Sequence, residues 1–276
     1  MLVSECKIND NEMKWVTATS ENNFKTQNFE LINKKFNSYA YLNKFVIMKI
    51  MNILEKLKNQ VIISVQAMPN EPLYKEECLT AMMQSVVNGG AKVLRLAGAR
   101  DVKNAKKLFD IPVIGLTKPD KLPENWMEVV YITPTLKEVD ELINAGADII
   151  ATDATNRPRP KESLEEILQH IKSNNKLSMA DISTFEEGVK AREMGFDIIS
   201  TTLSGYTKHS RQELITPDFE LLEKLVKELD CPIILEGRVW EPSEVDKAFE
   251  LGAYSVVIGS AVTRPQLITK RFIERG

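Results

Sequence analysis

Ionic and polar side chains recur in this chain directly after short apolar runs. The eight runs are followed in order by Gln66, Arg95, Lys118, Asp153, Asp181, residues 204–207 with Tyr206, residues 236–238, and residues 259–260 with Arg264. A single residue of this kind has an ordinary explanation, because strand ends meet solvent. Eight of them predict one shared face, on which Lys118, Glu236 and Asp153 must pair or hold a ligand, because an unpaired buried charge is costly.

The last two of these positions indicate phosphate binding. Gly237 and Gly259-Ser260 expose backbone N–H groups, and we expect a short helix beginning near Thr263 to point its N-terminus at the same spot. Oriented N–H groups and the helix dipole favour an anion, and Arg264 adds a positive charge. The alternative is that these glycines only make tight turns. We expect Gly237, Arg238, Gly259 and Ser260 to hold a phosphate group.

Four segments of the chain share one pattern, which is a helix end, a glycine and an apolar strand. They are residues 88–94, 144–150, 193–199 and 251–257. The glycine adopts the left-handed conformation that ends a helix. Helix starts are indicated by Thr135 with Glu138 and by Ser183 with Glu186, which have capping-box spacing, and by Pro242-Ser243. The strands are continuously apolar, which is typical of strands buried on both faces.

Eight strands are expected, and a short extra piece lies at residues 130–133. The strands are residues 61–67, 92–98, 112–118, 148–154, 176–182, 197–203, 232–237 and 255–260. Alternating strands and helices predict a parallel sheet, and eight such units are typical of a (β/α)8 TIM barrel. A doubly wound sheet is the competing architecture, but residues 66–69 are not the glycine-rich turn it needs. A barrel would place the polar strand ends on its catalytic face.

Composition excludes several classes of protein. The 276 residues include 36 basic and 39 acidic ones, a net charge of −3, which argues against a general nucleic-acid binder. No run approaches the ~18 apolar residues of a membrane span. Three scattered cysteines fit a reducing, cytoplasmic location, and with two histidines the chain cannot build a multi-histidine metal site. We therefore expect no metal and no cofactor.

Residues 1–50 differ from the rest of the chain. All 12 glycines and all 12 prolines follow residue 50, and the opening stretch has neither a helical nor a strand period. It also lacks the features of a signal peptide. One interpretation is a mostly disordered extension. The other is that Met51 or Met48 is the true start, with a gene-model artefact or an unneeded leader upstream. We expect one barrel domain at residues 51–276.

The strand-end motifs occur in the order of one known family. They are Gln66-Ala67, Arg95, Lys118, residues 131–135 (YITPT), 153–155 (DAT), 179–184 (MADIST), 200–207 (STTLSGYT), 236–238 (EGR) and 263–265 (TRP). From about Met51 onward the chain closely resembles the bacterial-type N-acetylmannosamine-6-phosphate 2-epimerases. The resemblance implies a (β/α)8 isomerase that interconverts N-acetyl-D-mannosamine 6-phosphate and N-acetyl-D-glucosamine 6-phosphate in sialic acid and amino-sugar breakdown. Residues 119–128 are a few residues longer than in that family.

The resemblance also assigns roles to single residues. It implies that Lys118 and Glu236 are the catalytic pair. It implies substrate contacts for Gln66, Arg95, Asp153 and Arg264, and we expect a further contact from Tyr206. The partner is then a phosphorylated N-acetylhexosamine, with a homodimer as an open alternative for the assembly.

The expected chemistry follows from the bond that must break. Inverting C2 requires removal of its proton, which is acidic in the open-chain sugar because C2 adjoins the C1 aldehyde. Lys118 serves as the base only if its pKa is lowered, as burial and Arg95 would do and Asp153 would oppose. Glu236 projects from the far side of the ring and supplies a proton directly or through a sugar hydroxyl. The structural alternative for Lys118 is an ion pair with Asp153.

Three other functions remain open at this point. A metal-dependent pentose-phosphate epimerase shares the barrel and the phosphate site but needs strand-end histidines. A phosphate-binding regulatory barrel keeps the glycines without needing a lysine and a glutamate across its mouth. A transferase similar to thiamine-phosphate synthase needs an acidic magnesium-binding set.

Overall fold

The computed structural model describes residues 6–9, 12–15, 48 and 50–274, and the chain divides into two compact units. In the first unit, Met1–Met48, strands β1 (Cys6–Asn9) and β2 (Glu12–Trp15) pair in an antiparallel sheet. These strands were not expected from the sequence, because four residues are too few to establish a period. Apart from residues 48 and 50, the rest of the expected extension lies outside the described residues. The second unit, Lys49–Gly276, begins close to the boundary expected at residue 50.

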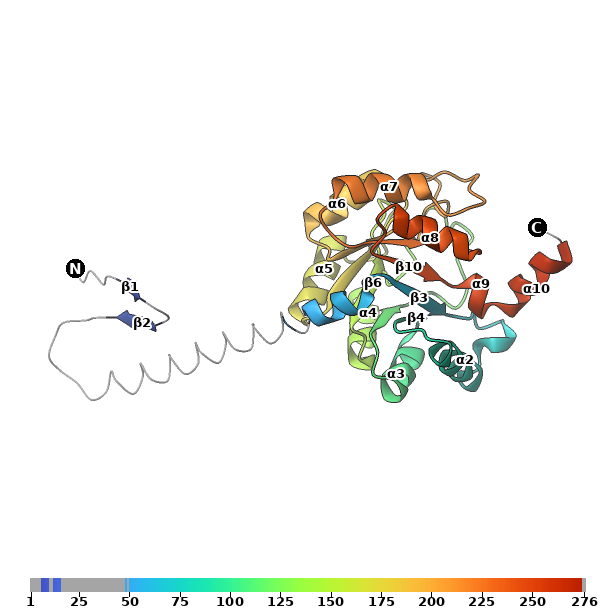
Figure 1. Ribbon diagram of the computed structural model, residues 1–276, viewed down its shortest axis with the longest axis horizontal. Coiled ribbons are helices and arrows are strands. Elements are labelled where there is room, and N and C mark those ends of the chain that lie inside the picture. The colour runs from blue at the N-terminus through green and yellow to red at the C-terminus, as the bar shows by residue number, and fades with distance from the viewer. Residues whose placement is uncertain (1–5, 10–11, 16–47, 49, 275–276) are drawn as a thin grey trace. The chain divides into compact units, whose positions relative to one another are not determined.

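The second unit contains a closed barrel of eight parallel strands (Figure 1). The strands are β3 (Gln60–Val65), β4 (Leu94–Ala97), β5 (Val113–Leu116), β6 (Ile149–Asp153), β7 (Leu177–Asp181), β8 (Ile198–Ser200), β9 (Ile233–Glu236) and β10 (Ser255–Ile258). Because β10 pairs with both β9 and β3, the sheet has no edge, and the doubly wound alternative is wrong. The eight expected strands and the (β/α)8 barrel are confirmed. The extra piece at residues 130–133 is a loop.

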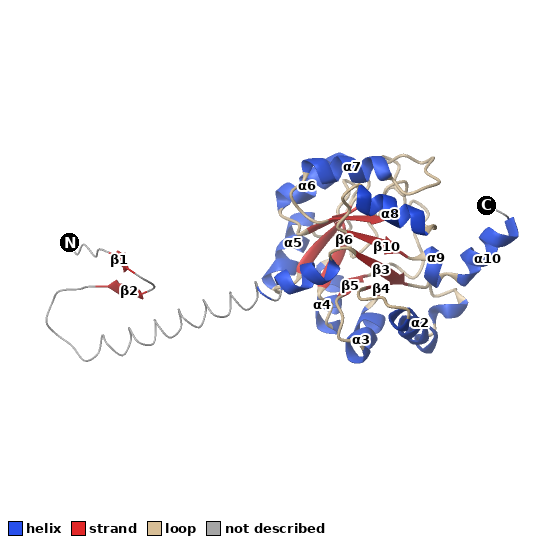
Figure 2. Ribbon diagram, viewed as in Figure 1, coloured by secondary structure: helices blue, strands red, loops and turns tan. Residues whose placement is uncertain are grey.

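Helices surround the strands of the barrel (Figure 2). They are α2 (Glu76–Asn88), α3 (Ala99–Leu108), α4 (Leu136–Ala145), α5 (Leu164–Ser173), α6 (Phe185–Met194), α7 (Phe219–Glu228), α8 (Pro242–Glu250), α9 (Ser260–Thr263) and α10 (Pro265–Glu274). A 3-10 helix, η1 (Pro72–Tyr74), lies between β3 and α2, and residues 50–57 are helical before β3. Within the described residues, no helix has the length and apolar character needed to cross a membrane.

Of the four predicted helix starts, the one at Thr135 and the one at Pro242, where α8 begins, are correct, and the other two are wrong. Thr135 and Glu138 form the expected capping box, which starts α4. Helix α6 begins one residue later than predicted, at a capping box of Thr184 and Glu187. Glu187 is the buried one of two adjacent glutamates, and its carboxylate also accepts hydrogen bonds from the backbone and hydroxyl of Ser183. Burial therefore selects the register where sequence spacing alone is ambiguous.

The second wrong boundary is the helix expected to begin near Thr263. Helix α9 instead begins at Ser260 after the N-cap Gly259 and ends at Thr263. Arg264 has φ −120° and ψ 76°, and α10 starts at Pro265. A residue before proline is disfavoured in the α conformation, so Arg264 interrupts the helix.

The barrel interior is filled by apolar side chains, and the helix at residues 50–57 packs against the same cluster. Ile53 and Leu57 lie in this cluster with strand residues such as Ile62 and Ile198. The hydroxyl of Tyr254 donates a 2.8 Å hydrogen bond to the carbonyl oxygen of Leu54, just before β10 begins. The helix therefore closes the N-terminal end of the barrel and leaves the C-terminal end open for a site.

Candidate active site

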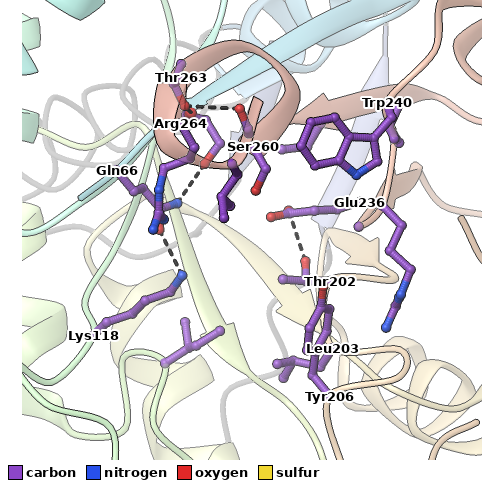
Figure 3. Close-up of a pocket in the computed structure, with 18 of the residues that line it drawn as sticks. Gln66, Lys118, Thr202, Leu203, Tyr206, Glu236, Trp240, Ser260, Thr263 and Arg264 are labelled. Carbon is purple, nitrogen blue, oxygen red and sulfur yellow. Dashed lines mark hydrogen bonds between the residues drawn. The ribbon is translucent and has the colours of Figure 1, made fainter. Parts of the chain in front are cut away.

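A cavity of about 420 Å³ lies at the C-terminal ends of the barrel strands (Figure 3). Nine of the eleven predicted site residues line it, namely Gln66, Lys118, Tyr206, Glu236, Gly237, Arg238, Gly259, Ser260 and Arg264. They come from the ends of five different strands and from the segments that follow them. Closure of the barrel brings these segments together, although they lie far apart in the sequence.

Lys118 enters the cavity two residues beyond the end of β5. Its Nζ donates a 2.9 Å hydrogen bond to Oε1 of Gln66, whose amide Nε2 donates to the hydroxyl of Ser64 at 2.7 Å. Burial and, next to it, the positive charge of Arg95 lower the pKa of Lys118 to about 8, against the opposing effect of Glu236 and Asp181. A substantial fraction of this lysine is thus an uncharged amine just above neutral pH, as a general base requires.

Glu236 is the last residue of β9 and faces the cavity from the side opposite Lys118 (Figure 3). Its Oε2 accepts a 3.0 Å hydrogen bond from the hydroxyl of Thr202 and lies 3.1 Å from Nε of Arg95. Burial raises the pKa of Glu236, and Arg95 opposes this effect. A carboxyl group with a raised pKa holds a proton more readily, so Glu236 is suited to donate one.

Arg95 lies beneath the cavity and does not line it. Its side chain is 1% exposed, and its Nη2 donates a 2.6 Å hydrogen bond to Oδ2 of the fully buried Asp181. The same guanidinium lies against Glu236, so one arginine holds two carboxylates. This geometry makes Arg95 a support for Glu236. Its expected contact with substrate stays a prediction.

Asp153 is also outside the cavity lining. It is fully buried, and its carboxylate accepts hydrogen bonds from Arg157 Nη2 at 2.5 Å and from the hydroxyl of Thr155 at 2.7 Å. The ion pair between Lys118 and Asp153, considered above as the structural alternative for Lys118, is therefore wrong. The carboxylate is surrounded by protein donors in this arrangement, and its expected contact with substrate stays a prediction.

The expected phosphate end of the cavity is built by the segments after β9 and β10. Gly237 has φ 109°, a conformation that favours glycine, and Gly259 precedes α9. Arg264 donates through Nη2 to the carboxylate of Glu71, while its Nε is buried without a hydrogen-bond partner. A buried guanidinium nitrogen without a hydrogen-bond partner is unusual. An anion bound at this end of the cavity would accept a hydrogen bond from it.

Arg238 and Tyr206 form a stacked pair in the cavity wall. The guanidinium carbon lies 4.6 Å from the centre of the Tyr206 ring, and Nη1 donates a 2.9 Å hydrogen bond to the carbonyl oxygen of Ser204. The φ of 78° at Gly205 favours glycine, and the absence of a side chain leaves room for the guanidinium of Arg238. The pair therefore gives the cavity an aromatic and cationic rim.

Several further residues line the cavity, and their types and spacing in the sequence did not indicate a role. They are Ser64, Tyr131, Ile132, Thr202, Leu203, Val239, Trp240, Val257, Thr263 and Leu267. Thr202 lies within a motif quoted above, but its type alone does not separate it from the neighbouring hydroxyl residues. Trp240 carries a detectable signal, since it is an aromatic residue four positions after a strand-end glutamate. Within the described residues, no three His, Cys, Asp or Glu side chains are grouped closely enough to hold a metal ion.

Comparison with known proteins identifies the family of this chain. A family described as "Putative N-acetylmannosamine-6-phosphate epimerase" matches residues 79–275. Two similar curated proteins, both named "Putative N-acetylmannosamine-6-phosphate 2-epimerase", come from Clostridioides difficile and Caldanaerobacter subterraneus. They are 48% and 49% identical to this chain, over 80% and 81% of its length and 98% and 93% of theirs.

One solved structure is similar in both sequence and fold, and another is similar in fold only. The N-acetylmannosamine-6-phosphate 2-epimerase from Clostridium perfringens is 44% identical, with a TM-score of 0.76, over 81% of this chain and 96% of that one. A thiamine phosphate pyrophosphorylase from Pyrococcus furiosus, at 16% identity and a TM-score of 0.50, shares the fold alone. With the family match and the curated relatives, these similarities show that the chain belongs to the N-acetylmannosamine-6-phosphate 2-epimerase family.

Proposed function

We propose that this enzyme interconverts N-acetyl-D-mannosamine 6-phosphate and N-acetyl-D-glucosamine 6-phosphate by proton transfer at C2. The observation that carries the proposal is the pair of groups across the cavity. Lys118 has a pKa lowered to about 8, and Glu236, opposite it, has a raised pKa. Two groups whose environments move their pKa values toward each other are suited to taking and returning a proton near neutral pH.

The reaction begins on the open-chain sugar. The lone pair of Lys118 Nζ takes the C2 proton, and the electrons of the C–H bond form an enolate whose negative charge lies on the C1 oxygen. When the enolate collapses, C2 takes a proton on its other face, and Glu236 supplies that proton directly or through a sugar hydroxyl. Hydrogen bonds and positive charge near the C1 oxygen stabilise the enolate, and Gln66 and Lys118 are the candidate donors.

We expect the phosphate group of the substrate to bind where the segments after β9 and β10 line the cavity. Gly237, Gly259, Ser260 and Arg264 offer backbone N–H groups and a guanidinium at one end of the cavity. Binding energy gained there orients the sugar and positions C2 between Lys118 and Glu236. Arg238 adds a second positive charge at the rim, stacked on Tyr206.

Turnover of N-acetylmannosamine 6-phosphate, followed in heavy water by proton NMR, tests this function. We expect conversion to the glucosamine epimer with deuterium at C2, both with and without excess EDTA. A requirement for a divalent cation would instead support a metal-dependent epimerase or transferase. Phosphosugar binding without any turnover would support a regulatory barrel. Glu236→Gln should abolish turnover, because an amide cannot donate the proton.

A further inference from the structure

One hydroxyl group lies between the buried carboxylate of Asp181 and the carboxylate of Glu236, which faces the cavity. Thr202 follows β8, and its Oγ1 is 2.7 Å from Oδ1 of Asp181 and 3.0 Å from Oε2 of Glu236. It is also 2.9 Å from the hydroxyl of Ser200. Figure 3 shows the contact between Thr202 and Glu236 at the cavity surface. The hydroxyl is therefore within hydrogen-bond distance of three oxygen atoms.

A threonine hydroxyl has one hydrogen, so it donates to only one carboxylate at a time. Its oxygen can meanwhile accept a hydrogen bond from Ser200 or from a protonated carboxyl group. If Glu236 is protonated, a chain runs from Glu236 through Thr202 to Asp181. If Glu236 is ionised, Thr202 donates to Glu236 and accepts from Ser200. The two arrangements differ only in hydrogen positions and need no movement of the heavy atoms.

The charges around Glu236 make both arrangements accessible. The charged groups that face it are Arg95 from β4, Lys118 from the segment after β5, and Asp181 from β7. Arg95 balances Asp181, with which it shares a 2.6 Å contact. A proton on Glu236 with a neutral Lys118, or an ionised Glu236 with a charged Lys118, both leave the cluster neutral. Net charge in a buried cluster is costly, so turnover should move between these two states.

We propose that Thr202 is a positioning residue whose hydroxyl donates to Asp181 while Glu236 is protonated and turns to Glu236 when that proton leaves. The proposal rests on the proposed function for the role of Glu236 as a proton donor. The Thr202 hydroxyl should also affect the pKa of Glu236 in the substrate-free enzyme. A donor that reaches ionised Glu236 stabilises the carboxylate, so it offsets part of the increase in pKa that burial causes.

Replacement of the hydroxyl by a methyl group of equal size tests this effect. In Thr202→Val, ionised Glu236 loses its donor, and its pKa should rise by about one unit. Thr202→Ser keeps the hydroxyl and should retain the wild-type value. Thr152→Val is a matched control, because Thr152 is a fully buried threonine on β6 whose hydroxyl donates to the carbonyl oxygen of Thr133. It should leave the pKa of Glu236 unchanged.

The measurement is a carbon NMR titration of the full-length, substrate-free enzyme labelled with 13C at the glutamate carboxyl carbons. The resonance of Glu236 is the one missing from Glu236→Gln. This readout does not depend on turnover, so it is separate from the assay of the proposed function. Wild-type turnover of the 6-phosphate, measured in parallel, shows whether that function holds.

A higher pKa in Thr202→Val together with a wild-type value in Thr202→Ser supports the proposal. An unchanged or lower pKa in Thr202→Val overturns it, even if activity falls. Thr202→Ala provides a second hydroxyl-free variant and should show the same increase. If neither hydroxyl-free variant folds while Thr152→Val does, the hydroxyl stabilises the barrel rather than tuning Glu236, and the proposal is also overturned.

Discussion

Nζ of Lys118 donates its hydrogen bond to Oε1 of Gln66, a neutral amide, rather than to a carboxylate. A carboxylate at that position would stabilise the ammonium form and keep the lysine protonated. Gln66 holds the amine in place without adding a charge, while burial and Arg95 lower its pKa. The contact therefore orients a base without weakening it, and the first two predictions below depend on this arrangement.

Removal of the Lys118 amine should stop proton transfer at C2. Loss of a general base typically reduces the rate by ~10²–10⁴-fold, and we expect the upper end for Lys118→Ala because no histidine lines the cavity. Deuterium incorporation from heavy water should be lost with turnover, while binding of the phosphosugar, measured by calorimetry, should persist. Lys137→Ala, at a side chain 86% exposed on α4, is the control. Near-normal turnover by Lys118→Ala would contradict its assignment as the base.

The pH dependence should follow the protonation of Lys118. Because the base works only as a neutral amine, kcat/KM should increase with pH up to about 8, the pKa of this group. Gln66→Glu places a negatively charged carboxylate beside the amine of Lys118 and so raises the pKa of Lys118. The rising limb of the profile should then move to higher pH by about one unit or more. Gln66→Met removes the hydrogen bond without adding charge. A profile that moves equally in both variants would show that the charge at position 66 does not control the base.

The strand ends could be located from the sequence, but the depth of each side chain could not. Arg95 follows an apolar run just as Lys118 does. However, the register pairs Arg95 with Ser64 and Ile114, so it lies lower in the barrel than Gln66 and Lys118. Residue type and order along the chain do not show how far along the barrel axis a side chain lies. Arg95 consequently extends beneath the cavity to Asp181 and Glu236.

Asp153 illustrates a second limit of the sequence. It ends β6 at the expected position, yet its carboxylate binds Arg157, four residues further along the same loop. The sequence contains both residues, but only the path of the loop determines that they meet. The catalytic face and nine of the predicted cavity residues followed from the strand pattern and the family motifs. Which polar residues pair with one another depends on the three-dimensional path of the chain, and the sequence alone does not give it.

Loss of Arg264 should weaken substrate binding more than it slows chemistry. Arg264 lines the cavity together with Gly259 and Ser260, where we expect the phosphate to bind, so Arg264→Ala should chiefly raise KM for the 6-phosphate. Inhibition by inorganic phosphate should weaken in parallel. Because the positive charge of Arg264 is one of the groups that lower the pKa of Lys118, the pH limb should also move slightly upward. A decrease in kcat with unchanged KM would place Arg264 near the reacting carbon instead.

Removal of the residues before the barrel should leave the enzyme active only if the helix at residues 50–57 is kept. Its residues Ile53 and Leu57 are buried in the barrel cluster, and the carbonyl oxygen of Leu57 accepts a 2.7 Å hydrogen bond from the hydroxyl of Ser255.

A chain that begins at Met48 retains all of these contacts, so its thermal midpoint and kcat/KM should match those of the full-length protein. A chain that begins at Gln60 loses the helix and exposes the interior cluster. The aliphatic side chains of Ile53 and Leu57 are buried, and burial of each contributes about 1.5–3 kcal/mol to the free energy of unfolding. Together they are a large fraction of the stability of a typical domain. The shorter chain should therefore be insoluble or melt at a much lower temperature. If the chain from Met48 also loses its activity or its stability, residues 1–47 contribute to the fold, and the domain boundary near residue 50 is misplaced.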